Sequence, residues 1–299
     1  MEQATQRMLA AAGIRPGHRV LDIAAGAGDQ SLAAARIVGS GGYVLATDVS
    51  APMLKAAEKA AQQAGLSNVG TKVMDAQHID LEPESFDAAI SRNGLMYIPD
   101  LLQALTGVRR VLHQGGKFAA LVWSKAENNP AFAQPLAILF RYAGVPEPSF
   151  GGRGLFDLGD RDLAAGLFCD AGFSDVTTET IPLVIRAPSA EAYFLQRKRT
   201  SMMAELFNKL SEDDREKAER EIMEALRPFE KKRSIRSARR IPARRGEQIV
   251  RSNSMLLRLN GCIDKRLSSA PHEICAVFLL GLTFLQNNDT FIHEYMFIC

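Results

Sequence analysis

The chain has 299 residues, of which 46% are hydrophobic and 23% are charged, so it can bury one large core or two modest ones. This composition excludes a fibrous chain and a wholly disordered one. The longest uncharged apolar run, ICAVFLLGLTFL, is about half of the roughly 20 residues that a membrane-spanning helix needs. The first residues also lack the apolar core of a secretory signal. We therefore expect a cytoplasmic protein without a transmembrane segment.

The charge distribution divides the chain into two parts, and the cysteine spacing excludes two kinds of site. Residues 231–299 hold 12 Lys and Arg against 5 Asp and Glu, a net charge of +7, whereas residues 1–230 hold 24 against 29, a net charge of −5. The chain thus has two compositional parts. No C-x-x-C spacing occurs, so neither a zinc site nor a disulfide framework is predicted. The cysteines are Cys169, Cys262, Cys275 and Cys299.

Apolar segments alternate with amphipathic ones over the first 123 residues. A short helix is expected over residues 2–12, and further helices over residues 29–38, 51–65 and 99–112. Strands are expected at RVLDIAA, YVLATDVS, VGTKVMDA, SFDAAISRN and GKFAALVW. Strands this apolar, separated by helices, predict a parallel sheet that is covered on both faces, hence a doubly wound α/β fold.

The pattern changes after Trp123. Helices are expected over residues 128–144 and 160–172, and a longer sixth strand over residues 173–186. Residues 189–229 are expected to be almost wholly helical. Within them, Ser211 is a predicted N-cap that precedes an acidic first turn.

The stretch VLDIAAGAGDQ joins the first strand to the next helix through a turn of small residues. This turn lies at the carboxyl end of a parallel strand, where doubly wound folds bind ligands. Gly26 and Gly28 lack a Cβ that would hold a ligand away, and the helix start offers free N–H groups. Asp48 ends the second strand and is placed to accept both hydroxyls of a ribose. The pattern favours a ligand that contains adenosine.

Three features distinguish among the adenosine ligands. Ser31 stands where a dinucleotide-binding turn has its third glycine. Asp29 lies where a pyrophosphate would lie, and its charge would repel one. The sequence also has no G-x-x-x-x-G-K-[ST] motif for a nucleoside triphosphate. An adenosine ligand without phosphates, carrying a compact zwitterionic tail, fits these features, and S-adenosylmethionine is such a ligand.

Five stretches in order carry a family resemblance: VLDIAAGAGDQ, VLATDVSAPML, VMDAQHID, FDAAISRNGLMYIPD and RRVLHQGGKFAALVW. They resemble the motifs of class I S-adenosylmethionine-dependent methyltransferases, nearest the type 11 branch that contains the ubiquinone/menaquinone-biosynthesis C-methyltransferases. The resemblance is strong over residues 8–123 and looser to about Phe229. It implies a Rossmann-like, mostly parallel sheet of seven strands with a helical substrate cap, and S-adenosylmethionine as the cofactor.

The resemblance also implies roles for individual residues. Asp22 would fix the glycine turn and the cofactor's amino group, Asp48 would hold the ribose, and Asp75 would accept from the adenine amino group. For Asp75 the alternative is a turn or N-cap aspartate. Ala24 stands where the family often has glycine. The expected cofactor-binding residues are Asp22, Ala24, Gly26, Gly28, Asp48, Val49, Met53, Asp75, Ala76, Gln77, Ser91 and Arg92, with Asn93 beside the last two on the methyl-transfer face.

Methyl transfer is a displacement at an activated sulfonium carbon, so it needs mainly alignment and exclusion of water. A base is needed only if the acceptor must lose a proton, so no residue identifies itself as catalytic. Tyr97 is a candidate beside the acceptor site, with ordinary packing as the alternative. Residues 128–142 and the segment AYFLQRKRTSMMAELF are expected to close the acceptor pocket. Phe194, Leu195, Met202, Met203 and Phe207 form either an apolar lid or ordinary core.

The predicted function is transfer of a methyl group from S-adenosylmethionine to carbon or oxygen of a small molecule, aromatic or quinone-like in character. No specific nucleic-acid partner and no metal are expected. Two alternatives stay open. One is a protein that binds S-adenosylmethionine without catalysis, and the other is an NAD-linked oxidoreductase, which Asp29 and Ser31 disfavour.

The end of the chain departs from the family, whose members finish with an antiparallel strand beside the sixth. We expect a domain over residues 1–230, with a cofactor-binding core to residue 124 and a cap with the sixth strand after it, followed by an atypical tail over residues 231–299. The tail begins with a basic run, predicted to be either a solvated segment or a tether for nucleic acid or acidic membrane. Its segment QIVRSNSMLLRL could replace the missing strand.

Overall fold

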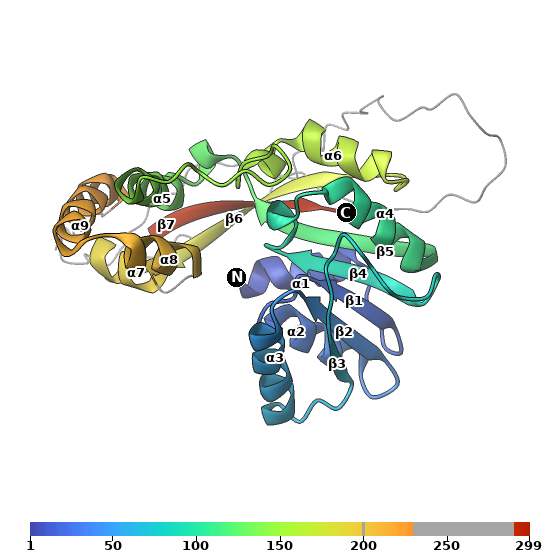
Figure 1. Cartoon of the computed structure of the whole chain (residues 1–299). Helices are drawn as coiled ribbons and strands as arrows, with labels where there is room; N and C mark the ends of the chain where they lie inside the picture. Colours follow the sequence, from blue (N-terminus) through green and yellow to red (C-terminus); the bar gives the residue numbers. More distant parts are fainter. Residues whose placement is uncertain (199–200, 230–289) are drawn as a thin grey trace, which may run out of the picture.

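The computed structural model describes residues 1–198, 201–229 and 290–299. The strands form one sheet of seven in the order β3-β2-β1-β4-β5-β7-β6 (Figure 1). Strands β1 to β5 are parallel, whereas β7 runs antiparallel between β5 and β6. This confirms the predicted doubly wound, mostly parallel sheet. The strands are β1 Arg19–Ile23, β2 Tyr43–Asp48, β3 Val69–Val73, β4 Phe86–Arg92, β5 Leu112–Trp123, β6 Thr178–Arg186 and β7 Thr290–Ile298.

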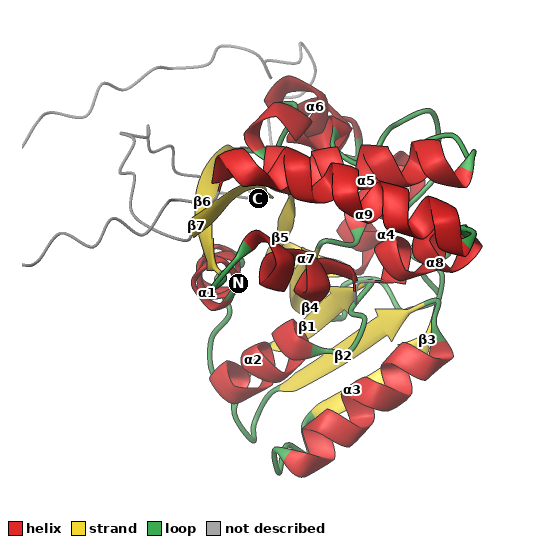
Figure 2. Ribbon diagram, turned by 90° about the vertical axis from the view of Figure 1, so that its left-hand side faces the viewer, coloured by secondary structure: helices red, strands yellow, loops and turns green. Residues whose placement is uncertain are grey.

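The helices divide into those along the sheet and those beyond its end. Figure 2 shows α2 and α3 against β1, β2 and β3, while α5, α7, α8 and α9 gather at one end of the sheet, on the left in Figure 1. We call these four helices the cap. The helices are α1 Glu2–Ala11, α2 Asp29–Val38, α3 Ala51–Gln63, α4 Leu101–Val111, α5 Pro130–Ala143, α6 Arg161–Asp170, α7 Ala190–Lys198, α8 Ser201–Lys209 and α9 Glu212–Leu226.

Local signals explain where the cap's last helix starts. The hydroxyl of Ser211 accepts from the backbone N–H of Asp214 at 3.2 Å, which confirms the predicted N-cap. Glu212, Asp213 and Asp214 in the first turn complement the positive end of the helix dipole. Arg141 of α5 then pairs with Glu221, which ties two cap helices together.

Helix α1 is fixed to the sheet near the ends of its strands. Met8 and Leu9 are fully buried in the main core. Arg7 makes a 2.8 Å ion pair with Glu179 of β6, whose side chain is buried. Burial raises the pKa of Glu179, and the Arg7 charge opposes that rise. These contacts hold the first turn of α1, with Met1 and Thr5, beside the end of β4.

The last strand is the main departure from expectation. The segment considered as its replacement, residues 248–259, lies outside the described residues. Instead Thr290–Ile298 fills the place between β5 and β6, with Tyr295 opposite Trp123 on one side and Ile181 on the other. Tyr295, Met296 and Ile298 are buried, so this interior strand lacks the polar alternation that would have marked it. The domain boundary at residue 230 stays a prediction.

In the described part of the chain, no helix combines the length and the apolar character needed to cross a bilayer. No cluster of His, Cys, Asp and Glu able to hold a metal ion occurs among those same residues.

Candidate functional site

The carboxyl ends of β1 to β5 open onto one cavity of about 830 Å³. Parallel strands end at the same edge of a sheet, and such edges are the usual ligand sites of this architecture. The structure brings most of the predicted site residues together there, whereas Asp22, Gly28 and Ser91 do not line the cavity. The predicted residues that do line it are Ala24, Gly26, Asp48, Val49, Met53, Asp75, Ala76, Gln77, Arg92, Asn93 and Tyr97.

The turn after β1 has a backbone that favours small residues. Ala24, Gly26 and Gly28 all have positive φ, at 52°, 58° and 82°. A Cβ added at Gly28 would lie 2.7 Å from the Cβ of Ala57, so glycine lets α2 approach α3. Ala24 holds a left-handed conformation that costs a residue with a Cβ about 1–2 kcal/mol. The turn therefore exposes bare main chain to the cavity at some cost in strain.

Asp48 ties the end of β2 to this turn. Its Oδ2 accepts from the backbone N–H of Gly26 at 2.8 Å, and its Oδ1 accepts from that of Ser50 at 2.8 Å. Each carboxylate oxygen has a second lone pair, so both can accept another hydrogen bond. Asp48 thus fixes the turn that shapes the cavity, and it can still accept further hydrogen bonds at the cavity's edge.

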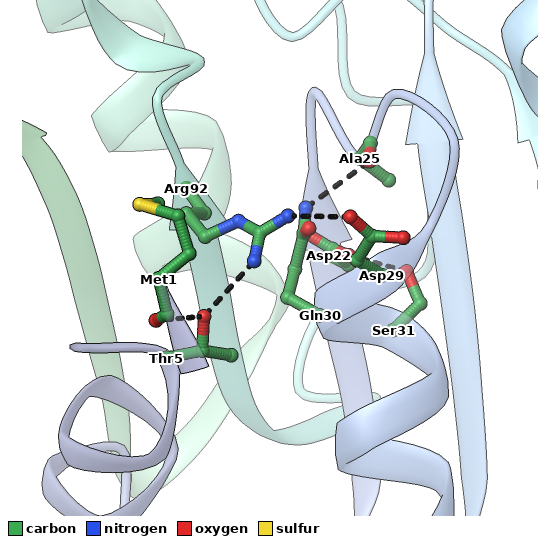
Figure 3. Close-up of polar contacts among 8 residues, drawn as sticks. All are labelled: Met1, Thr5, Asp22, Ala25, Asp29, Gln30, Ser31 and Arg92. Atoms are coloured by element: carbon green, nitrogen blue, oxygen red, sulfur yellow. Dashed lines mark hydrogen bonds and ion pairs between the residues drawn. The ribbon is translucent and has the colours of Figure 1, made fainter. Parts of the chain in front are cut away.

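Asp22 lies beneath the turn, with no exposed surface (Figure 3). Its Oδ1 accepts from Gln30 Nε2 at 3.2 Å, and its Oδ2 accepts from the Ser31 hydroxyl. Burial raises the pKa of Asp22 to about 7, although the hydrogen bonds from Ser31 and Gln30 act to lower it. Gln30 also donates to the carbonyl of Ala25 at 3.1 Å and itself lines the cavity. The predicted link from Asp22 to a ligand would therefore run through Gln30.

Arg92 joins three elements at the rim of the cavity (Figure 3). Its Nη1 donates to the Thr5 hydroxyl at 2.9 Å, and its Nη2 lies 3.2 Å from Asp29 Oδ2. The Thr5 hydroxyl donates to the carbonyl of Met1 at 3.2 Å. Arg92 at the end of β4 thereby holds the starts of α1 and α2 together and neutralises Asp29.

Asp75 and Gln77 form a local network after β3. Asp75 Oδ1 accepts from the Gln77 backbone N–H at 2.9 Å, and Gln77 Nε2 donates to the same carboxylate at 3.1 Å. These hydrogen bonds hold the pKa of Asp75 below its ordinary value. Gln77 Oε1 accepts from the Asp100 N–H at 3.0 Å. Asp75 thus has the turn role that was the alternative to adenine binding, and it also lines the cavity.

Aromatic rings form the other end of the cavity. Trp123 is stacked between Phe132, at 4.5 Å between ring centroids, and Tyr295, at 4.3 Å. Tyr97 meets Phe150 edge to face at 5.4 Å, and burial raises the pKa of its phenol. At neutral pH Tyr97 therefore keeps its proton and can donate a hydrogen bond.

The apolar residues expected as either a lid or ordinary core are mostly ordinary core. Met202 lines the cavity, but Phe194, Met203 and Phe207 are buried in the core, and Leu195 is 52% exposed. Helical spacing does not distinguish a side chain that packs inside the cap from one that faces the cavity.

Sequence reasoning also missed several lining residues. Trp123 could have been found by the strand-end rule that selected Asp48, because it ends β5. Arg197 lies on α7, within the stretch expected to close the pocket, but no motif marked it. Tyr295 had no local signal, since it reaches the site through pairing with strands more than 100 residues away.

The close contact between Gly94 and Ala24 yields a stability prediction. A Cβ added at Gly94 would lie 2.5 Å from the Ala24 Cβ and 3.0 Å from Ser91 Oγ. We expect Gly94→Ala to lower the free energy of unfolding by about 1–3 kcal/mol, as overpacked sites do. Urea unfolding measures this change.

Ala24→Gly provides the matched control in a double-mutant cycle. Alone it relieves backbone strain but frees the unfolded chain, so we expect a net change below about 1 kcal/mol. Combined with Gly94→Ala, it should restore most of the lost stability, because the closest contact disappears. Strictly additive changes would contradict the packing described here.

Comparisons with known proteins match this architecture. The family model described as a methyltransferase domain matches residues 14–137. The ubiquinone/menaquinone biosynthesis C-methyltransferase UbiE of Cellvibrio japonicus is 39% identical over 119 residues, covering 40% of this chain and 48% of the relative. The demethylmenaquinone methyltransferase of Staphylococcus epidermidis is 30% identical over 176 residues, covering 54% of this chain and 70% of the relative.

Solved structures show the same fold. The YcgJ protein from Bacillus subtilis has 22% identity and a TM-score of 0.51, covering 73% of this chain and 88% of that protein. Phosphoethanolamine N-methyltransferase 2 from Haemonchus contortus, solved with phosphomonomethylethanolamine and S-adenosylhomocysteine, has 22% identity and a TM-score of 0.50, covering 76% of this chain and 49% of that protein.

The chain spans about half the length of the UbiE proteins of Cellvibrio japonicus and Teredinibacter turnerae. The Staphylococcus epidermidis relative is matched over 70% of its length. The strand order, the position of the cavity at the strand ends and the names of the matched relatives all indicate the same family. The chain belongs to the class I S-adenosylmethionine-dependent methyltransferases, whose cofactor is S-adenosylmethionine.

Proposed function

We propose that this protein transfers a methyl group from S-adenosylmethionine to a carbon or oxygen atom of a small aromatic or quinone-like acceptor. One observation carries the proposal. A single cavity joins the bare turn and acidic strand ends on one side to a wall of Trp123, Phe132 and Tyr295 on the other. A cofactor and a flat acceptor bound in that cavity would meet at its middle.

The residues at the acidic side fit the cofactor's parts. Asp48 keeps acceptor capacity on both oxygens, which suits the two ribose hydroxyls. The turn at Ala24 and Gly26 offers main chain for the methionine arm, and Gln30 offers a polar group supported by Asp22. Val49 is 69% exposed and Met53 is 44% exposed, so an adenine ring would cover both. We assign the adenine edge to Asp75, Ala76 and Gln77.

The protein's task in this chemistry is alignment. Bound S-adenosylmethionine would supply a sulfonium methyl group. Its transfer would leave a neutral thioether and form one C–C or C–O bond, and the proton displaced from the acceptor would pass to solvent. The protein would hold the acceptor nucleophile in line with that methyl group and exclude water. Tyr97 keeps its proton at neutral pH, so its role would be a hydrogen bond to the acceptor rather than removal of a proton.

The names of the relatives favour a ring carbon as the methylated atom. The matched proteins from Cellvibrio japonicus and Staphylococcus epidermidis are named for C-methylation in ubiquinone/menaquinone biosynthesis and for demethylmenaquinone. Aromatic side chains on the cavity wall suit a flat acceptor of that kind.

Two measurements test the proposal. S-adenosylmethionine and S-adenosylhomocysteine should each raise the melting temperature, and NAD should not. The protein should then transfer tritium from methyl-labelled S-adenosylmethionine to an aromatic component of a metabolite extract. Cofactor binding without any labelled product would instead favour a binding protein without catalysis, and stabilisation by NAD alone would contradict the proposal.

A further inference from the structure

Tyr295 and Asn93 form a polar pair in the wall of the cavity. Both line it, and Tyr295 is 1% exposed. The Asn93 side chain lies beside the Tyr295 phenol, close enough to lower the phenol's pKa. Within the described part of the chain, Asn93 Oδ1 is buried without a hydrogen-bond partner. The Tyr295 O–H therefore does not donate to Asn93 Oδ1.

This arrangement leaves one donor and one acceptor side by side. The Tyr295 O–H is a donor that Asn93 Oδ1 does not take up. Asn93 Oδ1 is an acceptor whose burial without a partner is costly. A ligand hydroxyl can satisfy both at once, because it accepts from one group and donates to the other.

The backbone and the surrounding charges support a binding role for the pair. Asn93 has a φ of 57°, and such strain in a residue with a Cβ is concentrated at functional sites. Burial raises the pKa of Tyr295, so the phenol stays protonated as a donor, while the nearby guanidiniums of Arg197 and Arg92 act to lower it. The Tyr295 ring is also fixed by stacking on Trp123 at 4.3 Å.

We infer that Tyr295 and Asn93 form the polar end of the acceptor site and hold a hydroxyl group of the acceptor, so that strand β7 supplies a positioning residue for methyl transfer. This inference rests on the proposed function. The acceptor is then a hydroxylated aromatic compound. Its ring lies beside Trp123 and Phe132, and one of its hydroxyl groups contacts Tyr295 and Asn93.

The test uses the protein loaded with S-adenosylhomocysteine. Trp123 is the single tryptophan of the chain and lines the cavity, so its fluorescence reports occupancy. The two probes are 1,4-dihydroxynaphthalene and its dimethyl ether, which has the same ring but no O–H. The wild-type protein should bind the diol about tenfold more tightly than the ether, the effect of one buried hydrogen bond.

Three variants distinguish a role in positioning the acceptor from a general effect on the protein's structure. Tyr295→Phe and Asn93→Gly should each weaken diol binding about tenfold, leaving the affinities for the ether and for S-adenosylhomocysteine unchanged. Glycine tolerates the positive φ of position 93, so this variant removes the side chain without backbone strain. Tyr193→Phe is the matched control, because Tyr193 is also 1% exposed but does not line the cavity. It should bind the diol like the wild type.

Two outcomes would overturn the inference and leave the proposed function intact. One is equal wild-type affinity for the diol and the ether, and the other is undiminished diol binding by both Tyr295→Phe and Asn93→Gly. Wild-type protein that fails to bind S-adenosylhomocysteine would overturn the proposed function and, with it, this inference.

Discussion

Replacing Asp48 with alanine is expected to weaken the binding of S-adenosylmethionine by at least about 100-fold. Each hydrogen bond from a ribose hydroxyl to a carboxylate contributes roughly 1.5–3 kcal/mol, and the substitution removes two. Asp48 also accepts from the Gly26 and Ser50 N–H groups, so its loss frees the turn on which the methionine arm would lie. Titration calorimetry with S-adenosylmethionine and S-adenosylhomocysteine measures the effect.

Two further variants make the Asp48 result specific. Asp48→Asn keeps one acceptor oxygen, so its affinity should fall between those of the wild type and Asp48→Ala. Asp80→Ala removes a carboxylate whose side chain is 96% exposed and which pairs with Lys72 outside the cavity, so it should bind like the wild type. If Asp48→Ala kept wild-type affinity, the ribose contact assigned to this residue would be wrong.

The free energy of unfolding is expected to fall as the pH rises from about 4 to about 7, because of Asp22. Burial raises the pKa of this carboxyl from 3.8 to about 7 in the folded protein. Over that interval the folded protein keeps a proton on Asp22 that the unfolded chain has lost. The contribution of Asp22 to the free energy of unfolding is therefore complete below about pH 4 and decreases until the pH reaches the pKa of the folded state. The contribution lost is on the order of 4 kcal/mol.

Asp22→Asn isolates this contribution, because asparagine stays neutral and keeps one acceptor oxygen for Gln30 or Ser31. Urea unfolding of both proteins at pH 4.5 and pH 8 gives the comparison. The wild type should lose more stability than Asp22→Asn between the two values, since other titrating groups affect both proteins alike. Parallel pH dependences would show that Asp22 ionises normally in the folded protein.

Local pattern predicted much of the fold. Helix α2 has the predicted residues 29–38, because a glycine turn precedes it and Gly39 ends it. The five parallel strands were recognisable from their apolar runs. Strand β5 begins earlier than predicted, at Leu112 rather than at the start of the expected stretch GKFAALVW. Strand β7 was not predictable, because its place depends on pairing with β5 and β6 and no local signal encodes that.

In the candidate site, too, some residues were predictable from the sequence and others were not. Asp48 was identified because it ends a parallel strand, and strand ends meet at one edge. Arg92, which also ends a strand, was expected from the family resemblance. Asp29 is not the unpaired negative charge that was expected at the turn, since Arg92 pairs with it at 3.2 Å. Ser31 has a structural role at the place of the third glycine, because its buried hydroxyl donates to Asp22 beneath the turn. The Arg92–Asp29 pair joins residues 63 positions apart, so the local pattern around Asp29 did not reveal it.

A crystal structure of the protein with S-adenosylhomocysteine tests the central claim most directly. We predict the ribose hydroxyls on the Asp48 carboxylate, the amino-acid arm against the turn at Ala24 and Gly26, and the adenine beside Asp75 and Met53. A complex in which the molecule lies outside the cavity at the ends of β1 and β2 would contradict the account.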